Sequence, residues 1–357
     1  MTLWPELENS LVRSAARAIP SSARPSAPRG LLRRSRTTLG AVLVTAAVTA
    51  VVLVVLLIGR GRDATSTAIA DPLARAANAA LHQPSLFPRD HQYFFVRTEG
   101  TEPTGMSTKS GRTINAIETL VTDRWQSADR TSLQRTRVVA MRFESAADAT
   151  YWRAHGGPHL QVGATQSMSI PAVGKYYIDI GRGELTRAQV LALPSDPRAL
   201  YARLVPSSSR ITQLLRHASP QVLAQIAKLK SEYGSLNKYL AWAAFNAITS
   251  SFEQSPMPPA VRSAMYGALA LIPSVKSIGL DRDLVGRRGD AIVFTDRFRG
   301  IRTELIFDPD TSALLGERQT AIAKGVGFRE GSLIENLAYI DEAVTNNLSV
   351  PRIQRLH

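Results

Sequence analysis

A run of 20 residues without a charged side chain, from Leu39 to Ile58, constrains this chain more than any other feature. About 20 apolar residues in a helix, at roughly 1.5 Å per residue, cover the ~30 Å hydrocarbon core of a bilayer. Helices that are apolar on every side lie either in a large core or in a membrane. The run therefore predicts one transmembrane helix over residues 39–58, with the lipid bilayer as its first partner.

Positive charge is concentrated beside this run. The chain has 357 residues and a net charge of +14, and residues 1–62 hold nine of its arginines. The arginines closest to the start of the run are Arg29, Arg33, Arg34 and Arg36. Because cytoplasmic flanks carry the arginine excess, we expect a cell-membrane protein with a cytoplasmic N-terminus and an extracytoplasmic C-terminal domain. Nucleic acid is not an expected partner, since nucleic-acid binders carry their basic footprint on a folded domain.

Two other kinds of N-terminal segment share parts of this pattern. A cleaved signal peptide has an apolar region of about 7–15 residues, shorter than this run, although residues 68–70 (AIA) have the form of a cleavage site. Arg33-Arg34 resembles a twin-arginine signal, but Arg36 stands where an apolar residue is expected. An uncleaved span is the better interpretation.

Residues 1–38 are predicted to be a cytoplasmic tail with a short amphipathic helix. Leu7, Leu11, Ala15 and Ile19 recur at every fourth position and form one stripe. Three interpretations are open for this stripe. The tail can be a frayed segment that only sets topology, a helix that docks on a cytoplasmic regulator such as a sigma factor, or a helix that lies on anionic lipid.

After the span we expect a polar tether over residues 59–70, an exported domain over 71–347 and a C-terminal tail over 348–357. Helix starts with capping residues or prolines predict helices over 71–81, 187–193, 197–204, 220–233, 236–252 and 259–271. Runs of β-branched and aromatic residues predict strands over 93–99, 114–126, 133–144, 275–280, 290–297, 301–308, 313–322 and 335–344. Residues 145–182 are predicted to be irregular.

This order of elements predicts the fold class α+β. Strands come first, a central helical segment follows, and strands return. Strands with one apolar side are typical of an antiparallel sheet that packs its apolar face against helices. Such a sheet can curve into a half-barrel that encloses a cavity.

The sequence carries no persuasive catalytic or metal-binding motif. It has no cysteine, which excludes disulfides, thiolate metal sites and cysteine catalysis. His155 and His159 have helical metal-ligand spacing, but the Gly-Gly-Pro between them is hostile to a helix. Asp281, Asp283 and Asp290 are interpreted as surface charges on a hairpin, with Arg282, Arg287 and Arg288 as available ion-pair partners. We therefore expect a protein that is not an enzyme and has no cofactor or metal.

Three further features favour ordinary structural roles. Asp308 and Asp310 resemble the start of a calcium loop, but Pro309 and the missing glycine favour a turn. The two strands beside this turn are predicted to form a hairpin. Trp125, Trp152 and Trp242 are interpreted as packing residues.

Several stretches resemble a family of actinobacterial single-span membrane proteins without an assigned biochemical function. They are Gln92–Thr98, Leu193–Leu204, Met257–Val275, Gly286–Phe294 and Arg302–Gln319. The resemblance implies a short cytoplasmic tail, one span and a large exported domain. Members are often encoded near extracytoplasmic-function sigma factors, which implies a regulatory role like that of anti-sigma factors.

These observations lead to two functional hypotheses. The first is a non-enzymatic, single-pass envelope sensor or regulator, whose exported domain is linked to a cytoplasmic partner in an anti-sigma-like role. The second is a membrane-anchored binding module for an apolar ligand such as lipid. The ligand itself is unknown in both cases.

Overall fold

The computed structural model describes residues 64–351, apart from 109–110, 156–161, 178–183, 206–212, 214, 217 and 324–327. The predicted span over 39–58 and the tail before it lie outside the described residues. Within the described part, no helix is both long and apolar enough to cross a membrane. The described part corresponds to the domain predicted to follow the span.

Nine antiparallel strands of the described chain form one sheet, in the order β4-β3-β2-β1-β11-β10-β9-β8-β7. The strands are β1 (Tyr93–Ser107), β2 (Thr113–Gln126), β3 (Ser132–Phe143), β4 (Thr165–Ile170), β7 (Val275–Arg282), β8 (Arg288–Asp296), β9 (Ile301–Phe307), β10 (Leu314–Ala321) and β11 (Leu333–Thr345). A separate pair joins β5 (Tyr176–Tyr177) to β6 (Glu184–Leu185). Together with the helices, this sheet confirms the predicted α+β class.

The large sheet consists of two meanders joined by a single long-range pair, β1 with β11. Within each meander, strands that follow one another in the chain are neighbours, whereas β1 and β11 come from opposite ends of the domain. Their register runs from Tyr93 opposite Thr345 to Thr101 opposite Asn336, with a bulge after Arg97. This pair makes one sheet out of two.

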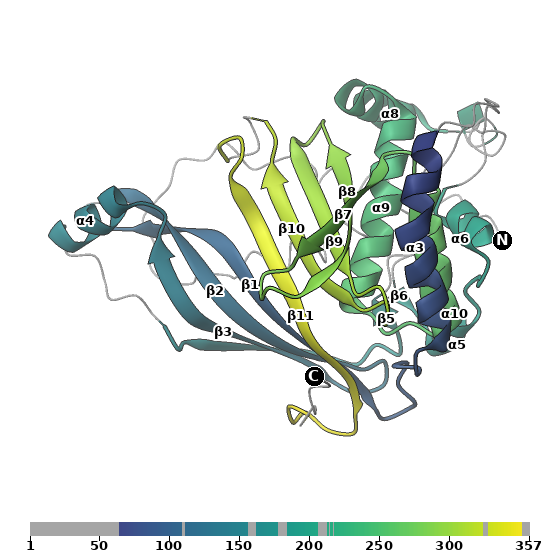
Figure 1. Cartoon of the computed structure of the whole chain (residues 1–357), viewed down its shortest axis with the longest axis horizontal. Coiled ribbons are helices and arrows are strands. Elements are labelled where there is room, and N and C mark those ends of the chain that lie inside the picture. Colours follow the sequence, from purple (N-terminus) through teal and green to yellow (C-terminus); the bar gives the residue numbers. More distant parts are fainter. Residues whose placement is uncertain are drawn as a thin grey trace.

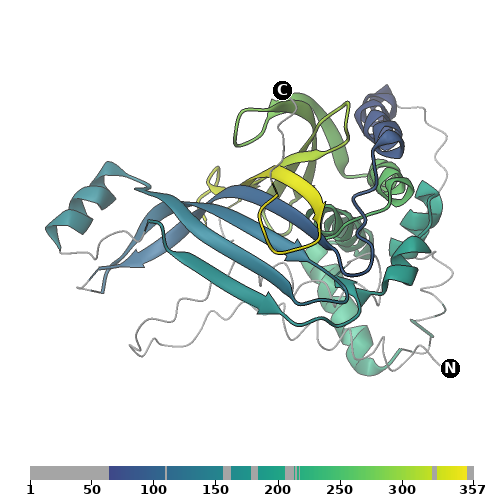
Figure 2. The same ribbon diagram turned by 90° about the horizontal axis from the view of Figure 1, so that it is seen from below.

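The helices gather mainly beside one half of the sheet. They are α3 (Ala64–His82), α4 (Ala146–Ala154), α5 (Arg187–Leu191), α6 (Pro197–Leu204), α8 (Pro220–Tyr233), α9 (Leu236–Gln254) and α10 (Pro259–Ala270). Figure 1 shows α3, α9 and α10 beside the β7–β10 half, with α4 alone at the far end of β1–β3. From below, the long strands β1–β3 extend well beyond the other helices toward α4, which lies at their far end (Figure 2).

The main core lies between these helices and one face of the sheet, which we call the inner face; the opposite face is the outer face. The inner face bears Phe294, Leu305 and Phe307, all of which are buried. Phe245 of α9 stacks on Phe294 with ring centroids 4.5 Å apart. Tyr266 of α10 meets Phe307 edge-on at 5.2 Å. Burial of each such side chain contributes about 1.5–3 kcal/mol, so this layer holds the helices on the sheet.

A second, smaller core lies beneath α4 on the same inner face. Trp152 of α4 packs against Phe143 of β3 with ring centroids 5.9 Å apart, above Met106 and Ile114. Alternate residues of a strand share a face, so Met106 lies on the same face as Phe94, which belongs to the main core. We call α4 at one end and α3, α9 and α10 at the other the two helical covers of the inner face. Between them, a stretch of the inner face is left without a helix over it.

An ion pair between a helix and the sheet reinforces the main core. Arg262 of α10 contacts Glu342 of β11 at 3.5 Å, and its Nη2 donates to the carbonyl oxygen of Ser312 at 3.2 Å. Tyr266 donates to the same oxygen. A buried charge needs a partner, so these contacts fix the orientation of α10 on β11 and on the turn before β10.

The first helix begins earlier than the sequence predicted. Helix α3 starts at Ala64 and contains Pro72 in its interior, so the predicted start at Asp71-Pro72 is wrong and part of the predicted tether over 59–70 is helical. A proline inside a helix removes one hydrogen bond. Burial holds the following turns to the rest of the domain through Leu73, Ala76 and Ala80. Tertiary packing therefore overrides the local signal.

Residues 145–182 are not irregular throughout, as the sequence analysis expected. They contain α4, β4 and β5. Ser145 begins α4 by accepting a hydrogen bond from the backbone N–H of Asp148 at 3.1 Å. The Ser-x-x-Asp pattern that makes this cap was available in the sequence.

The helix ends in the centre of the chain follow the predicted caps. Thr186 and Gln189 form the expected capping box at α5, and Asp196 caps α6, which has the predicted bounds. Ser219 caps α8, and Gly234 ends it with φ 72°. Local side-chain hydrogen bonds are sufficient to place these ends.

Two of the three aspartates predicted to be surface charges are buried instead. The fully buried side chain of Asp283 contacts Arg287 at 2.6 Å. Asp290, which is 8% exposed, contacts Arg75 of α3 at 2.8 Å. Only Asp281 is substantially exposed among the three, at 35%. The buried carboxylates are ion-pair partners that fix the β7–β8 hairpin and α3.

The close approach of β8 to β9 generates a prediction about Gly289. A Cβ at Gly289 would overlap the backbone carbonyl of Phe307. A Cβ at Gly105 would meet only Thr113 Cγ2, at 3.2 Å. We expect Gly289→Ala to lower the Tm of the full-length protein by at least about 4 °C, and Gly105→Ala to change it by less than half as much. Thermal unfolding followed by tryptophan fluorescence measures both, and equal shifts would contradict the proposed constraint.

Candidate functional site

The stretch of inner face between the two helical covers holds a small cavity of about 80 Å³. It is lined by Thr98, Gly100, Thr101, Glu102, Leu120, Thr122, Arg124, Glu335, Leu337 and Tyr339. These residues belong to β1, β2 and β11, so the wall is built from both meanders. Charged and hydroxyl-bearing side chains form much of the lining, and the cavity is therefore suited to a polar group.

Strand register explains why these residues meet. Gly100 lies opposite Leu337 of β11 on one side and opposite Leu120 of β2 on the other. Two residues further along β1, Glu102 lies opposite Glu118. On the other side of β11, Gln319 of β10 lies opposite Glu335. The two-residue period of the strands places all of these side chains on the inner face.

The carboxyl group of Glu335 is the most perturbed group in this site. Burial, together with the nearby negative charges of Glu317 and Glu102, raises its pKa to about 8. Both causes disfavour the charged form. At neutral pH, Glu335 is therefore mainly a protonated acid among carboxylates.

Glu317 of β10 is a buried carboxylate with incomplete hydrogen bonding. The residue is 5% exposed. Its Oε1 accepts a hydrogen bond from Gln319 Nε2 at 2.6 Å, whereas no described residue donates to its Oε2. An unsatisfied buried acceptor costs about 1–3 kcal/mol, more if it is charged, so this oxygen is poised to accept a donor.

The chemistry available to this site is charge neutralisation and proton exchange. An acid with a raised pKa beside carboxylates can take up or release a proton near neutral pH. Within the described residues, no group of three or more His, Asp and Glu side chains is arranged to hold a metal ion. A ligand with hydrogen-bond donors or a positive charge would complement the carboxyl groups of this site.

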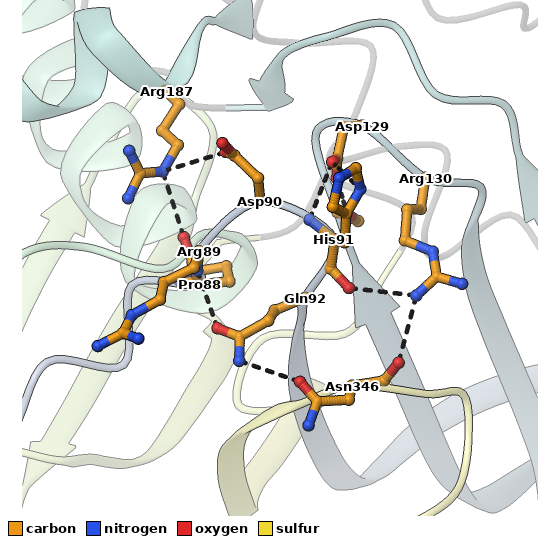
Figure 3. A network of polar contacts seen from close by, with 10 residues as sticks. Pro88, Arg89, Asp90, His91, Gln92, Asp129, Arg130, Arg187 and Asn346 are labelled. Atoms are coloured by element: carbon orange, nitrogen blue, oxygen red, sulfur yellow. Dashed lines mark hydrogen bonds and ion pairs between the residues drawn. The ribbon is translucent and has the colours of Figure 1, made fainter.

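A second polar cluster, which we call the junction network, lies at the end of the sheet where β1 begins (Figure 3). Arg130, from the β2–β3 turn, donates to the carbonyl oxygens of His91 at 3.1 Å and Asn346 at 3.2 Å. Gln92 donates to the side chain of Asn346 at 3.0 Å. Arg187 reaches Asp90 at 3.7 Å. These contacts tie the start of β1, the β2–β3 turn and the end of β11 together.

The junction network contains a serine, a histidine and an aspartate, but not in the order of a catalytic triad. Asp129 lies between the other two, accepting from Ser127 Oγ at 2.9 Å and lying 2.8 Å from His91 Nδ1. A nucleophilic serine has to donate to the histidine. Burial alone would raise the pKa of Asp129, but the hydrogen bonds from His91 and Ser127 outweigh it and lower the pKa. The network therefore serves a structural role and holds these three segments together.

Most residues that the sequence singled out lie outside the described part of the chain. These are the span over 39–58, the stripe formed by Leu7, Leu11, Ala15 and Ile19, and the topology arginines Arg29, Arg33, Arg34 and Arg36. His159 also lies outside it. His155 is the C-cap residue of α4 and stacks on Tyr151 with ring centroids 3.8 Å apart.

The predicted turn and the tryptophan packing are confirmed. Asp308 accepts hydrogen bonds from the backbone N–H groups of Asp310 and Thr311, at 2.8 and 2.9 Å. The strands on either side pair as a hairpin. Trp125 and Trp152 are buried, and Trp242 packs at the edge of the core.

Sequence reasoning missed Glu102, Glu317 and Glu335. One signal could have found the last of them. Glu335 alternates with Leu337 and Tyr339 along a strand, so it occupies a position where the inner-face pattern favours an apolar side chain. A charged residue in the apolar phase of a strand indicates either a buried pair or a site.

Comparison with known proteins adds no relative to these observations: no family model matches the chain, and no curated protein matches it. The family resemblance noted above therefore stays an expectation.

The raised pKa of Glu335 predicts a pH-dependent stability. Because its pKa lies above the ordinary value of 4.5 in the folded protein, the contribution of Glu335 is fully present at low pH and is lost as the pH rises through about 8. Glutamine resembles the protonated acid. We expect Glu335→Gln to raise the free energy of unfolding at pH 9 by at least about 1 kcal/mol, or about 2 °C in Tm, and to have little effect at pH 4.5.

Thermal unfolding of the full-length protein at both pH values measures this difference. Glu99→Gln is the matched control, because Glu99 lies on the outer face of the neighbouring strand β1. A pH-independent effect of Glu335→Gln, or the same pH dependence in both variants, would contradict the assignment.

Proposed function

We propose that this chain is a non-enzymatic, single-pass membrane protein whose exported domain binds a ligand on the inner face of its sheet. The main support for this proposal is the cavity, which is lined by side chains from β1, β2 and β11. In the same proposal, the sheet is a half-barrel with helical covers at its two ends. The uncharged run over 39–58 anchors this domain to the cell membrane.

The cavity favours a polar ligand over the apolar ligand of the second hypothesis. Glu102, Arg124 and Glu335 line it, and about 80 Å³ is too small for an acyl chain. Burial of ionisable groups against hydrocarbon without partners would be costly. A polar head group or a small polar molecule matches the size and the lining.

In this proposal the cytoplasmic tail passes the ligand state to a regulator, such as a sigma factor. The support is the stripe formed by Leu7, Leu11, Ala15 and Ile19, which is the kind of apolar helix face that docks into a partner groove. The family setting implied by the resemblance agrees with this role. An enzymatic role has less support, because the acidic cavity has no neighbouring nucleophile with an activating base among the described contacts.

Ligand binding by the exported domain predicts that the purified protein carries a bound small molecule. Full-length protein purified from its own host should show an added mass in native mass spectrometry that differs from detergent and phospholipid. Thr98→Phe places a large side chain in the cavity and should remove this mass, whereas Val121→Phe on the outer face should keep it. A phospholipid mass lost with Thr98→Phe would instead favour the apolar-ligand module. Absence of any added mass would contradict ligand binding.

Docking of the cytoplasmic tail on a regulator predicts that the tail contacts one discrete cytoplasmic protein. A photo-crosslinker at Leu7 or Leu11, in the native host, should give one protein adduct with a transcriptional regulator. The same crosslinker at Asn9, on the opposite side of the predicted helix, should give much less of it. Equal adducts at all three positions, or none with expression confirmed, would reduce the tail to a topology signal.

A further inference from the structure

The end of the domain opposite the junction network exposes basic and aromatic side chains together. Strand β11 runs from this end to the junction network, and its antiparallel neighbours β10, β9 and β8 place the β8–β9 turn beside its start. The turn exposes Arg297, Phe298 and Arg299, and Phe298 is 46% exposed. An exposed aromatic side chain between two arginines has the composition of segments that lie in a membrane interface.

The hairpin of α8 and α9 meets this turn through aromatic rings. Tyr233, the last residue of α8, lies against Phe298 with ring centroids 4.4 Å apart. Arg299 places its guanidinium carbon 5.2 Å from the ring centroid of Trp242 in α9. Tyr233 and Trp242 are 5.9 Å apart. Because tyrosine and tryptophan are enriched where apolar and aqueous layers meet, this cluster fits a lipid head-group region.

The charge exposed around these rings is mainly positive. Lys230 of α8 and Lys238 of α9 are exposed, and residues 220–240 hold three lysines against one glutamate. The carboxylate of Asp296 lies beneath the β8–β9 turn, where it accepts from the backbone N–H of Phe298 at 3.0 Å. We name the exposed and aromatic members together the end patch: Lys230, Tyr233, Lys238, Trp242, Arg297, Phe298 and Arg299.

The length of the chain limits how far this domain can lie from the membrane. Helix α3 begins at Ala64, and the uncharged run ends six residues earlier, at Ile58. An extended chain covers at most about 3.6 Å per residue, so the start of α3 lies within about 20 Å of the end of the proposed span.

Helix α3 begins at the same end of the domain as the end patch. Its later part contacts the early part of β8, through Arg75 and Asp290 at 2.8 Å. Residues 83–92 then lead from the end of α3 to the start of β1 at the junction network. Figure 1 shows the start of α3, α8 and the end of β8 at one end of the domain. The proposed anchor therefore brings the end patch to the membrane surface.

We propose that the end patch rests on the head groups of an anionic phospholipid bilayer. Phe298 inserts at the boundary between head groups and acyl chains, and Arg297, Lys230 and Lys238 contact lipid phosphates. The inference rests on the proposed function, because the membrane anchor of that proposal supplies the bilayer. It adds an orientation for the domain, in which the end patch faces the membrane and the junction network points away from it.

Charge and burial act together in this contact. Each lysine or arginine near an anionic surface shifts the docked-to-free ratio about fivefold toward docking, and removal of Phe298 from water adds to the shift. Salt weakens the contribution of charge, because the Debye length falls to about 3 Å at 1 M ionic strength. Docking should therefore require anionic lipid and weaken at high salt.

The test uses full-length protein in lipid nanodiscs with a fluorophore on one introduced cysteine, since the chain has no cysteine of its own. Asn237→Cys carries the fluorophore at an exposed position in the first turn of α9, beside the end patch. In discs of phosphatidylcholine and phosphatidylglycerol, a lipid with a nitroxide on its head group should quench this fluorophore. The same fluorophore at Thr131→Cys, in the β2–β3 turn at the opposite end, should not be quenched.

Charge reversal and lipid composition test the assignment to anionic lipid. Arg297→Glu combined with Lys230→Glu should lower the docked-to-free ratio at least about fivefold, as should discs of phosphatidylcholine alone. Arg137→Glu combined with Arg142→Glu is the matched control, because it reverses two exposed charges on the outer face of β3 and should leave quenching unchanged. The lipid comparison needs no charge variant, so it does not depend on how such a variant folds.

Two results would overturn the lipid assignment: equal quenching at Asn237→Cys and Thr131→Cys, and quenching that ignores lipid charge. Energy transfer between two labelled copies, in place of lipid quenching, would assign the end patch to a second copy of the chain instead. A fluorophore at Thr49→Cys, in the middle of the uncharged run, separates this failure from that of the proposed function. Quenching there by an acyl-chain nitroxide leaves the anchor intact and removes only the docking, whereas its absence removes both.

Discussion

The pairing of β1 with β11 is the constraint on which the rest of this structure depends. Each meander alone is a run of local hairpins, and only this pair brings the first and last strands of the domain together. The junction network fastens its end, where Arg130 bonds His91 and Asn346. Arg262 ties the helical layer to β11 through Glu342. Without this pair, the main helical layer would cover one meander, and the other would keep only the small core beneath α4.

The same pairing creates the candidate site. Glu317 of β10 already lies beside β11 within one meander, and the pairing of β1 with β11 adds the charge of Glu102 near Glu335. The domain elsewhere matches its buried charges, as with Asp290 and Arg75. Glu335 is an exception, because burial and neighbouring negative charges raise its pKa to about 8, and strongly perturbed groups of this kind cluster at functional sites.

Much of the fold could be predicted from local signals, and little of the candidate site could. The caps at Thr186 and Asp196 placed their helices because a side-chain hydrogen bond to the next turn is a local interaction. Pro72 misled the same reasoning, because burial of the following turns outweighs the loss of one hydrogen bond. The buried state of Asp283 could not be foreseen, since its partner is positioned by the hairpin.

The sequence by itself determined the elements of this protein: the uncharged run over 39–58, most helix and strand positions, and the α+β class. These follow from residue periodicity and capping, which act over a few residues. Only the tertiary structure decided which strands pair across the domain, which face the helices cover and which charges meet. Register is the physical reason, because a shift of one residue would move Glu102 and Glu335 to the outer face and away from the cavity.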